Sequence, residues 1–330
     1  MPFYLFLFLF AYFCFACDMF TANKYFTDDL YNVAISTVIA MVSYNFWLHE
    51  GSERVMKALC VVFLLGGLYL SYDIYVNYLQ NSNIMSLQYA YGDKNSLAPI
   101  LLCCGFIVFR MFTPQSRLLY WGGRAIAVAM LFVMILLRSR ATFVCGLYIL
   151  YYFVFKSKNR KLKLWILALS ALLGVYVLLN ANFYDILFNG IIMAGRDSSD
   201  VNQVSSGRFF LIMTALPNIP KHPWVGIGDF YLDCMPIAML IQYGIIGVAI
   251  VFFFLYYIYK KLVKLDKNNL LFSTAFILYM VMLVNGLFEA RAPFGPGTKS
   301  FMLWMFVAFA FAKAELEAQS DTRRAVKSAF

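Results

Sequence analysis

Residues 180–234, NANFYDILFNGIIMAGRDSSDVNQVSSGRFFLIMTALPNIPKHPWVGIGDFYLDC, form the one long polar interval in a sequence that otherwise consists of apolar runs. Its charged and titratable side chains include Arg196, Arg208, Lys221, His222, Asp197, Asp200, Asp229 and Asp233. When a chain of apolar runs gathers its polar groups in one loop, that loop commonly serves binding or catalysis. The alternative is a solvated connection without chemistry.

The composition of the chain identifies its class. Hydrophobic residues make up 62% of the sequence, charged residues only 13%, and the mean hydropathy is +0.72. A water-soluble domain of this composition would expose too much apolar surface, so the sequence predicts an integral membrane protein. The net charge of +10 does not indicate nucleic acid binding. The basic residues fall in short loops between apolar runs, where they set membrane orientation instead.

Apolar runs long enough to cross a hydrocarbon core of about 30 Å contain roughly 20 residues. Candidate spans lie at 3–17, 30–48, 55–79, 97–112, 118–137, 141–155, 162–179, 235–259, 270–288 and 299–312. They predict a single all-α polytopic membrane domain over residues 1–330, with about ten transmembrane helices. The interval 180–234 would connect the seventh and eighth. The first run lacks the positively charged flank of a signal peptide, so we expect a retained span or the remnant of a longer one.

The lysines and arginines concentrate in alternate loops. The loops that contain Lys57, Lys158 and Lys264 belong to the basic set, whereas 180–234 belongs to the less basic set. Because basic loops remain in the cytoplasm, both termini are expected to be cytoplasmic and the loop 180–234 extracytoplasmic.

Several arginines lie on the expected outer side, where the positive-inside rule predicts few basic residues. They lie at the ends of predicted spans or in the long loop: Arg138, Arg140, Arg196, Arg208 and Arg291. The planar guanidinium suits bidentate recognition of phosphate or carboxylate. A lipid-linked diphosphate is the anion best placed to reach these residues. The alternative is interfacial contact with ordinary phospholipids, which is our interpretation of Lys94 and Lys299.

The sequence contains no recognisable metal motif. Most of the 7 cysteines lie inside apolar runs, where they behave as small hydrophobes. Cys14 and Cys17 form a C-x-x-C without a second ligand pair, and no D-x-D motif occurs on the expected outer side. We therefore expect neither a metal ion nor a cofactor.

Four motifs follow one another around the long loop. They are S-R-A at 139–141, S-G-R at 206–208, H-P-W-V-G-I-G at 222–228 and Y-G-I-I-G at 243–247. In this order they resemble the superfamily of O-antigen polymerases of the Wzy type and O-antigen ligases. Glu289, at the outer end of the ninth predicted span, also fits that pattern. The resemblance covers the C-terminal part of the chain, while the earlier part matches only as generic spans.

The resemblance implies a membrane-embedded glycosyltransferase with a GT-C-like architecture. Members of the superfamily are metal-independent inverting enzymes that use an undecaprenyl-diphosphate-linked glycan as donor on the outer face of the bacterial inner membrane. For this chain, it implies a polymerase of surface polysaccharide repeat units, such as O-antigen, capsule or exopolysaccharide. The implied partners are the lipid-linked donor and acceptor oligosaccharides, membrane lipids and a chain-length regulator, with no nucleic acid.

One departure from the pattern favours the polymerase over the ligase. Ligases of the superfamily carry an H-N pair eleven residues before the glycine that corresponds to Gly244, whereas this chain has Asp233 and Cys234 there. A ligase for another acceptor is one alternative, and a transporter or flippase of lipid-linked glycans is another. A transporter would place ionisable groups near the bilayer midplane and show related halves, and neither feature is evident in the sequence.

Glycosyl transfer needs a base beside the attacking hydroxyl and cations beside the departing diphosphate. Asp233 and His222 are the candidate bases. The candidate substrate-binding residues are Arg138, Arg140, Arg196, Arg208, Glu289 and Arg291. His222 has a second interpretation as part of a turn.

Local backbone features are expected to position these groups. Ser206 and Gly207 would form the turn or helix cap that presents Arg208. Gly226 and Gly228 would allow a tight backbone path.

Overall fold

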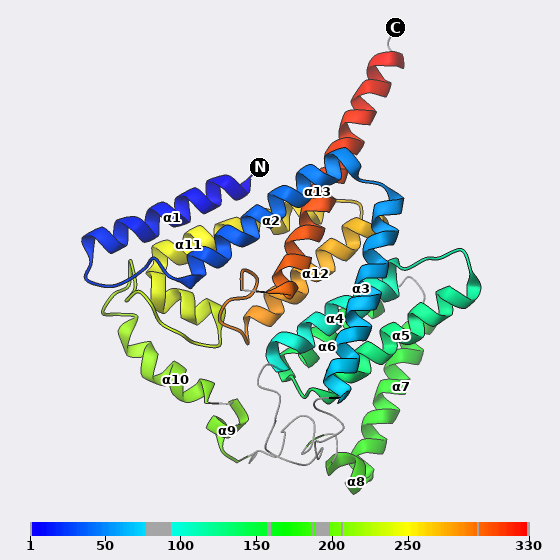
Figure 1. Ribbon diagram of the computed structural model, residues 1–330. Helices are drawn as coiled ribbons and strands as arrows, with labels where there is room; N and C mark the ends of the chain where they lie inside the picture. Colours follow the sequence, from blue (N-terminus) through cyan, green and yellow to red (C-terminus); the bar gives the residue numbers. More distant parts are fainter. Residues whose placement is uncertain are drawn as a thin grey trace.

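The computed structural model describes residues 2–76, 94–156, 160–185, 188, 199–205, 207–295 and 297–328. The regular elements in these residues are helices (Figure 1). The long ones are α1 (Pro2–Phe20), α2 (Asp28–Glu50), α3 (Glu53–Ile74), α4 (Lys94–Met111), α5 (Arg117–Leu136), α6 (Arg140–Lys156), α7 (Arg160–Leu179), α11 (Met235–Lys264), α12 (Leu270–Gly286) and α13 (Thr298–Ser328). Shorter ones are α8 (Ala181–Tyr184), α9 (Val201–Ser205), α10 (Arg208–Ala215) and the 3-10 helix η3 (Leu216–Asn218).

Each predicted span coincides with one of the long helices. Among the described residues, α1, α3, α4, α5 and α11 are long and apolar enough to cross a membrane by length and composition, and α7 and α12 contain shorter apolar stretches. The prediction of an all-α polytopic membrane protein is therefore confirmed. The helix that contains the last apolar run is longer than the run: α13 continues past residue 312 to Ser328, and its end projects from the bundle in Figure 1. The residues after 312 are polar, which ends the apolar run, but they include the strong helix formers Ala, Glu and Lys.

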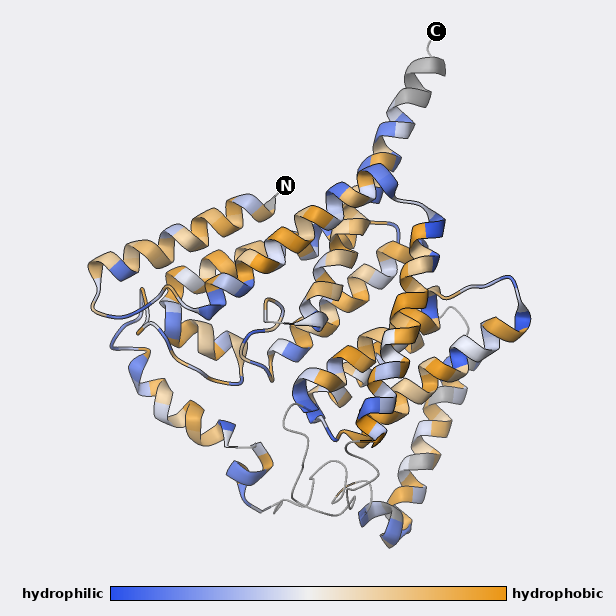
Figure 2. Cartoon of the chain, in the orientation of Figure 1, coloured by the Kyte–Doolittle hydropathy of each residue, from blue (hydrophilic) through white to orange (hydrophobic). Residues whose placement is uncertain are grey.

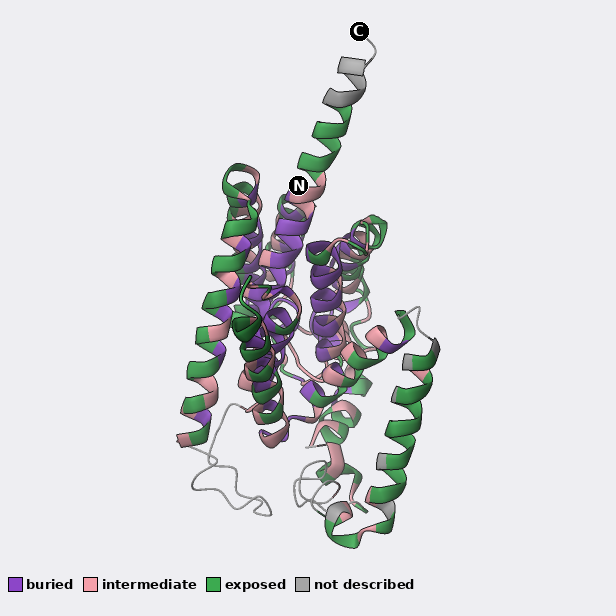
Figure 3. Ribbon diagram, turned by 90° about the vertical axis from the view of Figure 1, so that its right-hand side faces the viewer, coloured by how far each residue is buried: buried purple, intermediate pink, exposed green. Residues whose placement is uncertain are grey.

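Apolar side chains point both into the bundle and out of it. The interior contains Trp304, Tyr279 and Phe306, which are fully buried. Large apolar side chains on the outer helices, such as Phe8 of α1 and Leu169 of α7, are exposed. Figure 2 shows hydrophobic residues along the long helices, and Figure 3 shows that the outer helices are largely exposed. An apolar exterior around a packed interior is the arrangement expected of a helical bundle that faces lipid.

The two ends of the bundle differ. Both termini lie toward one end, which we call the termini end, whereas α8 and α9 lie at the opposite end, which we call the loop end (Figures 1 and 3). The termini end carries the lysines at the end of α11, and the loop end carries the start of α6 and the end of α12. The positive-inside rule predicts that the termini end is cytoplasmic.

We expect labelling to confirm this orientation. In a Cys234→Ser background, a cysteine at Ser199 should react with an impermeant maleimide added outside the cell, because Ser199 lies in the loop 180–234. A cysteine at Lys264, near the end of α11, should react only after the membrane is opened. A Ser199→Cys protein that is labelled only from the inside would contradict both this orientation and an extracytoplasmic active site.

Helix α11 is broken at Gly244, where the backbone has φ 60° and ψ −166°. The loop 223–228 fills this break with its own backbone. Ile227 N and Gly228 N donate to the carbonyl oxygens of Ile241 and Gln242 at 2.9 and 3.0 Å. On the other side of the break, Ile245 N and Ile246 N donate to the carbonyl oxygens of Pro223 and Trp224 at 2.9 and 3.1 Å. Backbone groups left unpaired inside a membrane are costly, so the loop and the broken helix stabilise each other.

Glycines make this close approach possible. Gly226 has φ 72°, and a Cβ there would lie 2.4 Å from the carbonyl oxygen of Gln242. A Cβ on Gly244 would lie 2.5 Å from the carbonyl carbon and oxygen of Trp224. Only glycine tolerates both the left-handed backbone and this spacing. The predicted tight path is confirmed, and the motifs at 222–228 and 243–247 are partners in one interlock.

Candidate active site

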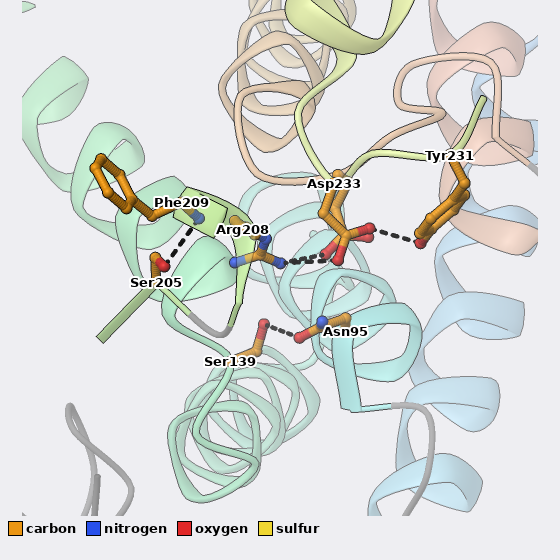
Figure 4. A network of polar contacts seen from close by, with 8 residues as sticks. Asn95, Ser139, Ser205, Arg208, Phe209, Tyr231 and Asp233 are labelled. Carbon is orange, nitrogen blue, oxygen red and sulfur yellow. Dashed lines mark hydrogen bonds and ion pairs between the residues drawn. The ribbon is translucent and has the colours of Figure 1, made fainter. Parts of the chain in front are cut away.

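The loop between α7 and α11 brings Arg208 to the loop end of the bundle. Arg208 is the first residue of α10, and the residue before it, Gly207, is the N-cap with φ 79°. The backbone N–H of Phe209 donates to Ser205 Oγ at 3.0 Å, which ties α10 to α9 (Figure 4). The prediction that Gly207 caps the helix that presents Arg208 is confirmed, whereas Ser206 lies outside the described residues.

Arg208 meets two carboxylates from distant parts of the chain. Its Nη2 lies 3.5 Å from Asp233 Oδ2, just before α11, and 4.0 Å from Glu289 Oε1, just after α12. The three side chains are partly buried, with exposures of 18% for Arg208, 28% for Asp233 and 16% for Glu289. Figure 4 shows Arg208 and Asp233 facing each other. We call Arg208, Asp233 and Glu289 the central triad.

Tyr231 fixes the second oxygen of Asp233. Its hydroxyl donates to Asp233 Oδ1 at 2.5 Å, and Figure 4 shows the two side chains in contact. Partial burial, followed by the hydrogen bond to Asp233 and the charge of that carboxylate, raises the pKa of Tyr231 to about 12. The phenol therefore stays protonated near neutral pH and keeps donating. The sequence analysis did not identify Tyr231 as a site residue. Its position two residues before Asp233 could have indicated it, because alternate side chains of an extended segment lie on the same side.

The turn between α5 and α6 also reaches this region. Arg140 begins α6, and its Nη1 donates to the backbone carbonyl of Val204 in α9. Arg138 is buried and has φ 54°, a left-handed backbone that is uncommon for a residue with a side chain. Ser139 Oγ donates to Asn95 Oδ1 at 3.4 Å, and Figure 4 shows this pair in the same view as Arg208 and Asp233. Backbone conformations of this kind are often retained at functional sites. The contact of Arg140 with Val204 places the start of α6 beside α9, the element that leads into Arg208.

Arg291 lies in a different cluster. Its Nε is 3.1 Å from Asp29 Oδ1 and its Nη2 is 3.6 Å from Asp28 Oδ2, at the start of α2. Tyr243, the residue before the break in α11, donates its hydroxyl to Asp29 Oδ2 at 3.2 Å. Arg291 thus connects α2 with the segment after α12. The ion pairs of Arg291 are with Asp28 and Asp29, so Arg291 lies outside the central triad, and its role in substrate binding stays a prediction.

Two other predicted residues have no observed place in the central triad. Arg196 lies outside the described residues. His222 is exposed; its backbone N–H donates to the carbonyl of Asn218 at 3.2 Å, and its carbonyl accepts from Gly226 N at 3.0 Å. Within the described residues, no hydrogen bond or ion pair joins its side chain to Asp233. This geometry favours the interpretation of His222 as a turn residue.

The position of Lys299 differs from the interfacial position that the sequence analysis predicted. It is only 7% exposed, in the first turn of α13, beside the fully buried Ser300. A lysine that contacts lipid headgroups would reach out of the protein, so the interfacial interpretation was wrong. Helix α13 packs against α2, α4 and α12, which the sequence alone does not reveal. Lys299 therefore adds a buried cation at the loop end.

Side chains of both charges lie in this part of the molecule. Over the part of the chain that the structure describes, no group of three or more His, Cys, Asp and Glu side chains is placed to hold a metal ion. Arg208 and Arg140 are the cations with observed contacts there, to the carboxylates and to α9 respectively. Asp233 and Glu289 supply the carboxylates.

Comparison with known proteins gives one match. A family model described as O-antigen ligase matches residues 125–244, which confirms the resemblance to O-antigen polymerases and ligases over that part of the chain. The matched segment contains Arg138, Arg140, Arg208, His222 and Asp233, whereas Glu289 and Arg291 lie beyond it. No curated protein matches the sequence. The match indicates a polymerase- or ligase-type enzyme that acts on lipid-linked polysaccharide substrates in the membrane.

Proposed function

We propose that this chain, similar over residues 125–244 to the O-antigen polymerase and ligase superfamily, polymerises the repeat units of a surface polysaccharide. It would take an undecaprenyl-diphosphate-linked oligosaccharide as donor on the outer face of the bacterial inner membrane. The glycan would pass to a hydroxyl group of an acceptor glycan. The convergence of Arg208, Asp233 and Glu289 from three segments at the loop end carries this proposal.

Arg208 has unused capacity to bind an anion. Its Nε is buried and has no hydrogen-bond partner among the described residues, while its Nη2 makes only long ion pairs of 3.5 and 4.0 Å. A buried donor without a partner costs about 1–3 kcal/mol, and a diphosphate oxygen would remove that cost. Arginine also suits phosphate because its donors form a planar fork. These observations support Arg208 as the main group of the diphosphate clamp, with Arg140 and Arg138 beside it.

Asp233 is the proposed general base. It would accept the proton of the acceptor hydroxyl while the hydroxyl oxygen attacks the anomeric carbon of the donor. As that bond forms, the bond from the anomeric carbon to the diphosphate oxygen breaks, and the electron pair stays on the diphosphate. Arg208 and Arg140 would stabilise the developing charge without a metal ion. Attack opposite the leaving group inverts the anomeric centre, and Tyr231 holds Asp233 in place during the step.

A ligase that transfers the glycan to another acceptor is the second candidate. The same clamp and base would serve it, and the family match covers both activities. Asp233 and Cys234, in place of the ligase H-N pair, favour the polymerase. We further propose that both termini are cytoplasmic and that a chain-length regulator acts with the enzyme.

Conservative arginine variants test the clamp. Arg208→Lys and Arg140→Lys should each lower polymer formation by about tenfold or more, because lysine keeps the charge but loses the bidentate fork. Binding of a lipid-linked diphosphate to the protein in nanodiscs should weaken in parallel, at an unchanged amount of inserted protein.

Arg117→Lys is the matched control. Arg117 is exposed at the start of α5, outside the segments that form the central triad, and should tolerate the same exchange. Near-normal polymer formation by both Arg208→Lys and Arg140→Lys would show that these arginines do not bind the donor diphosphate.

A further inference from the structure

An apolar groove lies on the outside of the bundle between α1 and α11, apart from the central triad. It has a volume of about 710 Å³. Leu5, Phe6 and Leu9 line it from α1, and Ala249, Phe253 and Tyr257 line it from α11. Leu5 and Phe253 are among the exposed large apolar side chains, so the groove is open to the lipid around the protein.

A second cavity, whose lining includes charged side chains, adjoins this groove at the termini end. It has a volume of about 470 Å³ and lies between α2, α11 and α13. Its charged lining consists of Lys261, Lys264 and Glu315. Lys261 lines the apolar groove as well, so the two cavities meet at its side chain.

The charged side chains that line this cavity have a net positive charge. Glu315 is the acidic residue in its lining, and the hydroxyl of Tyr44 donates a hydrogen bond to Glu315 Oε2. The two lysines outnumber that single carboxylate. Lys261 Nζ lies 5.1 Å from the ring centre of Tyr257 and 5.7 Å from that of Phe311, which places the ammonium group between the groove and the cavity.

We propose that the groove and the cavity together bind one anionic phospholipid. An acyl chain would lie in the apolar groove, and the phosphate of the headgroup would contact Lys261 and Lys264. The site lies at the end of the bundle that the positive-inside rule assigns to the cytoplasm, and anionic lipids give the cytoplasmic leaflet its negative surface potential. An apolar groove that ends at two cations matches an anionic lipid better than a zwitterionic one. The lysines would repel the positively charged group of a zwitterionic headgroup.

Lys260 provides a matched control for Lys261. It is adjacent in the sequence and carries the same charge at the same end of α11. Its Nζ lies over the ring of Tyr256 at 5.3 Å, and it lines neither the groove nor the cavity. A general attraction between basic residues and anionic lipids would involve both lysines, whereas a defined site involves only Lys261.

Native mass spectrometry of the full chain in mixed micelles tests the proposal, with phosphatidylglycerol and phosphatidylcholine as competing probes. The wild-type protein should retain phosphatidylglycerol in preference. Since a lysine near the surface contributes roughly fivefold to the affinity for anionic lipid, the double variant Lys261→Gln/Lys264→Gln should lose at least tenfold in retention. Lys260→Gln should retain the lipid as the wild type does, and so should Lys261→Arg.

Three results would overturn the proposal. Equal losses in Lys260→Gln and Lys261→Gln would show a diffuse surface charge, and equal retention of both lipids by the wild type would show no selection. Ala249→Trp tests the groove separately, because the larger side chain occupies the acyl-chain path. Unchanged retention in that variant would contradict a single lipid that occupies both cavities. The measurement requires no transferase activity, so its outcome is independent of the proposed function.

Discussion

Replacement of Asp233 by asparagine is expected to abolish polymer formation while the protein accumulates to its normal level. Loss of a general base typically lowers a rate by about 10²- to 10⁴-fold. Asparagine is nearly isosteric, and its side-chain oxygen can still accept the hydrogen bond from Tyr231. The variant therefore removes the charge and the basicity of Asp233 with little change in packing.

The comparison with His222→Gln identifies the base. The exposed His222 belongs to a turn, so His222→Gln should keep most of the activity or lower the amount of protein. Single-turnover rates at saturating donor separate chemistry from binding. If the His222→Gln enzyme binds donor but does not turn over, His222 is the general base. A normal single-turnover rate for Asp233→Asn, with weak donor affinity, would make Asp233 a residue that positions Arg208.

Gly244→Ala is expected to prevent the accumulation of folded protein. The new Cβ would lie 2.5 Å from the carbonyl of Trp224, and the backbone at φ 60° is unfavourable for alanine. Neither contact atom belongs to a flexible side chain, so the loop 223–228 would have to leave the break in α11. Loss of its backbone hydrogen bonds together with backbone strain should cost about 3 kcal/mol or more. The yield of monodisperse protein in detergent and its thermal unfolding temperature measure this effect.

Gly174→Ala is the control for that variant. Gly174 lies in α7, and a Cβ at this position would meet no other atom within 4 Å, so the methyl group of alanine enters open space. Alanine is also the better helix former by roughly 1 kcal/mol. Gly174→Ala should therefore leave the yield unchanged or raise it. Normal yield and stability for Gly244→Ala would contradict the interlock between the loop and α11.

The helices were predictable because their signal is local. Apolar runs of sufficient length specify spans one by one, and all the predicted spans coincide with helices. The apolar run at 299–312 predicted only part of α13, because the polar residues that follow it continue the helix without being apolar. The place of Arg208 and Asp233 in the candidate site was also predictable in outline, because both are polar residues between apolar segments.

The pairing of distant residues was not predictable from the sequence. Arg208 and Arg291 looked equivalent, yet one meets Asp233 and Glu289 while the other meets Asp28 and Asp29. These partners depend on how α2, α11 and α12 pack, and no local pattern specifies that packing. The same holds for Lys299, which is buried, and for the two glycine motifs that interlock.

Transfer between lipid-linked repeat units by the purified protein tests the central claim most directly. The protein is placed in liposomes with an undecaprenyl-diphosphate-linked repeat unit, and the products are separated by size. We predict a ladder of oligomers with release of undecaprenyl diphosphate, and its loss in Asp233→Asn. Movement of the donor across the bilayer without any new glycosidic bond would contradict the account and identify a transporter.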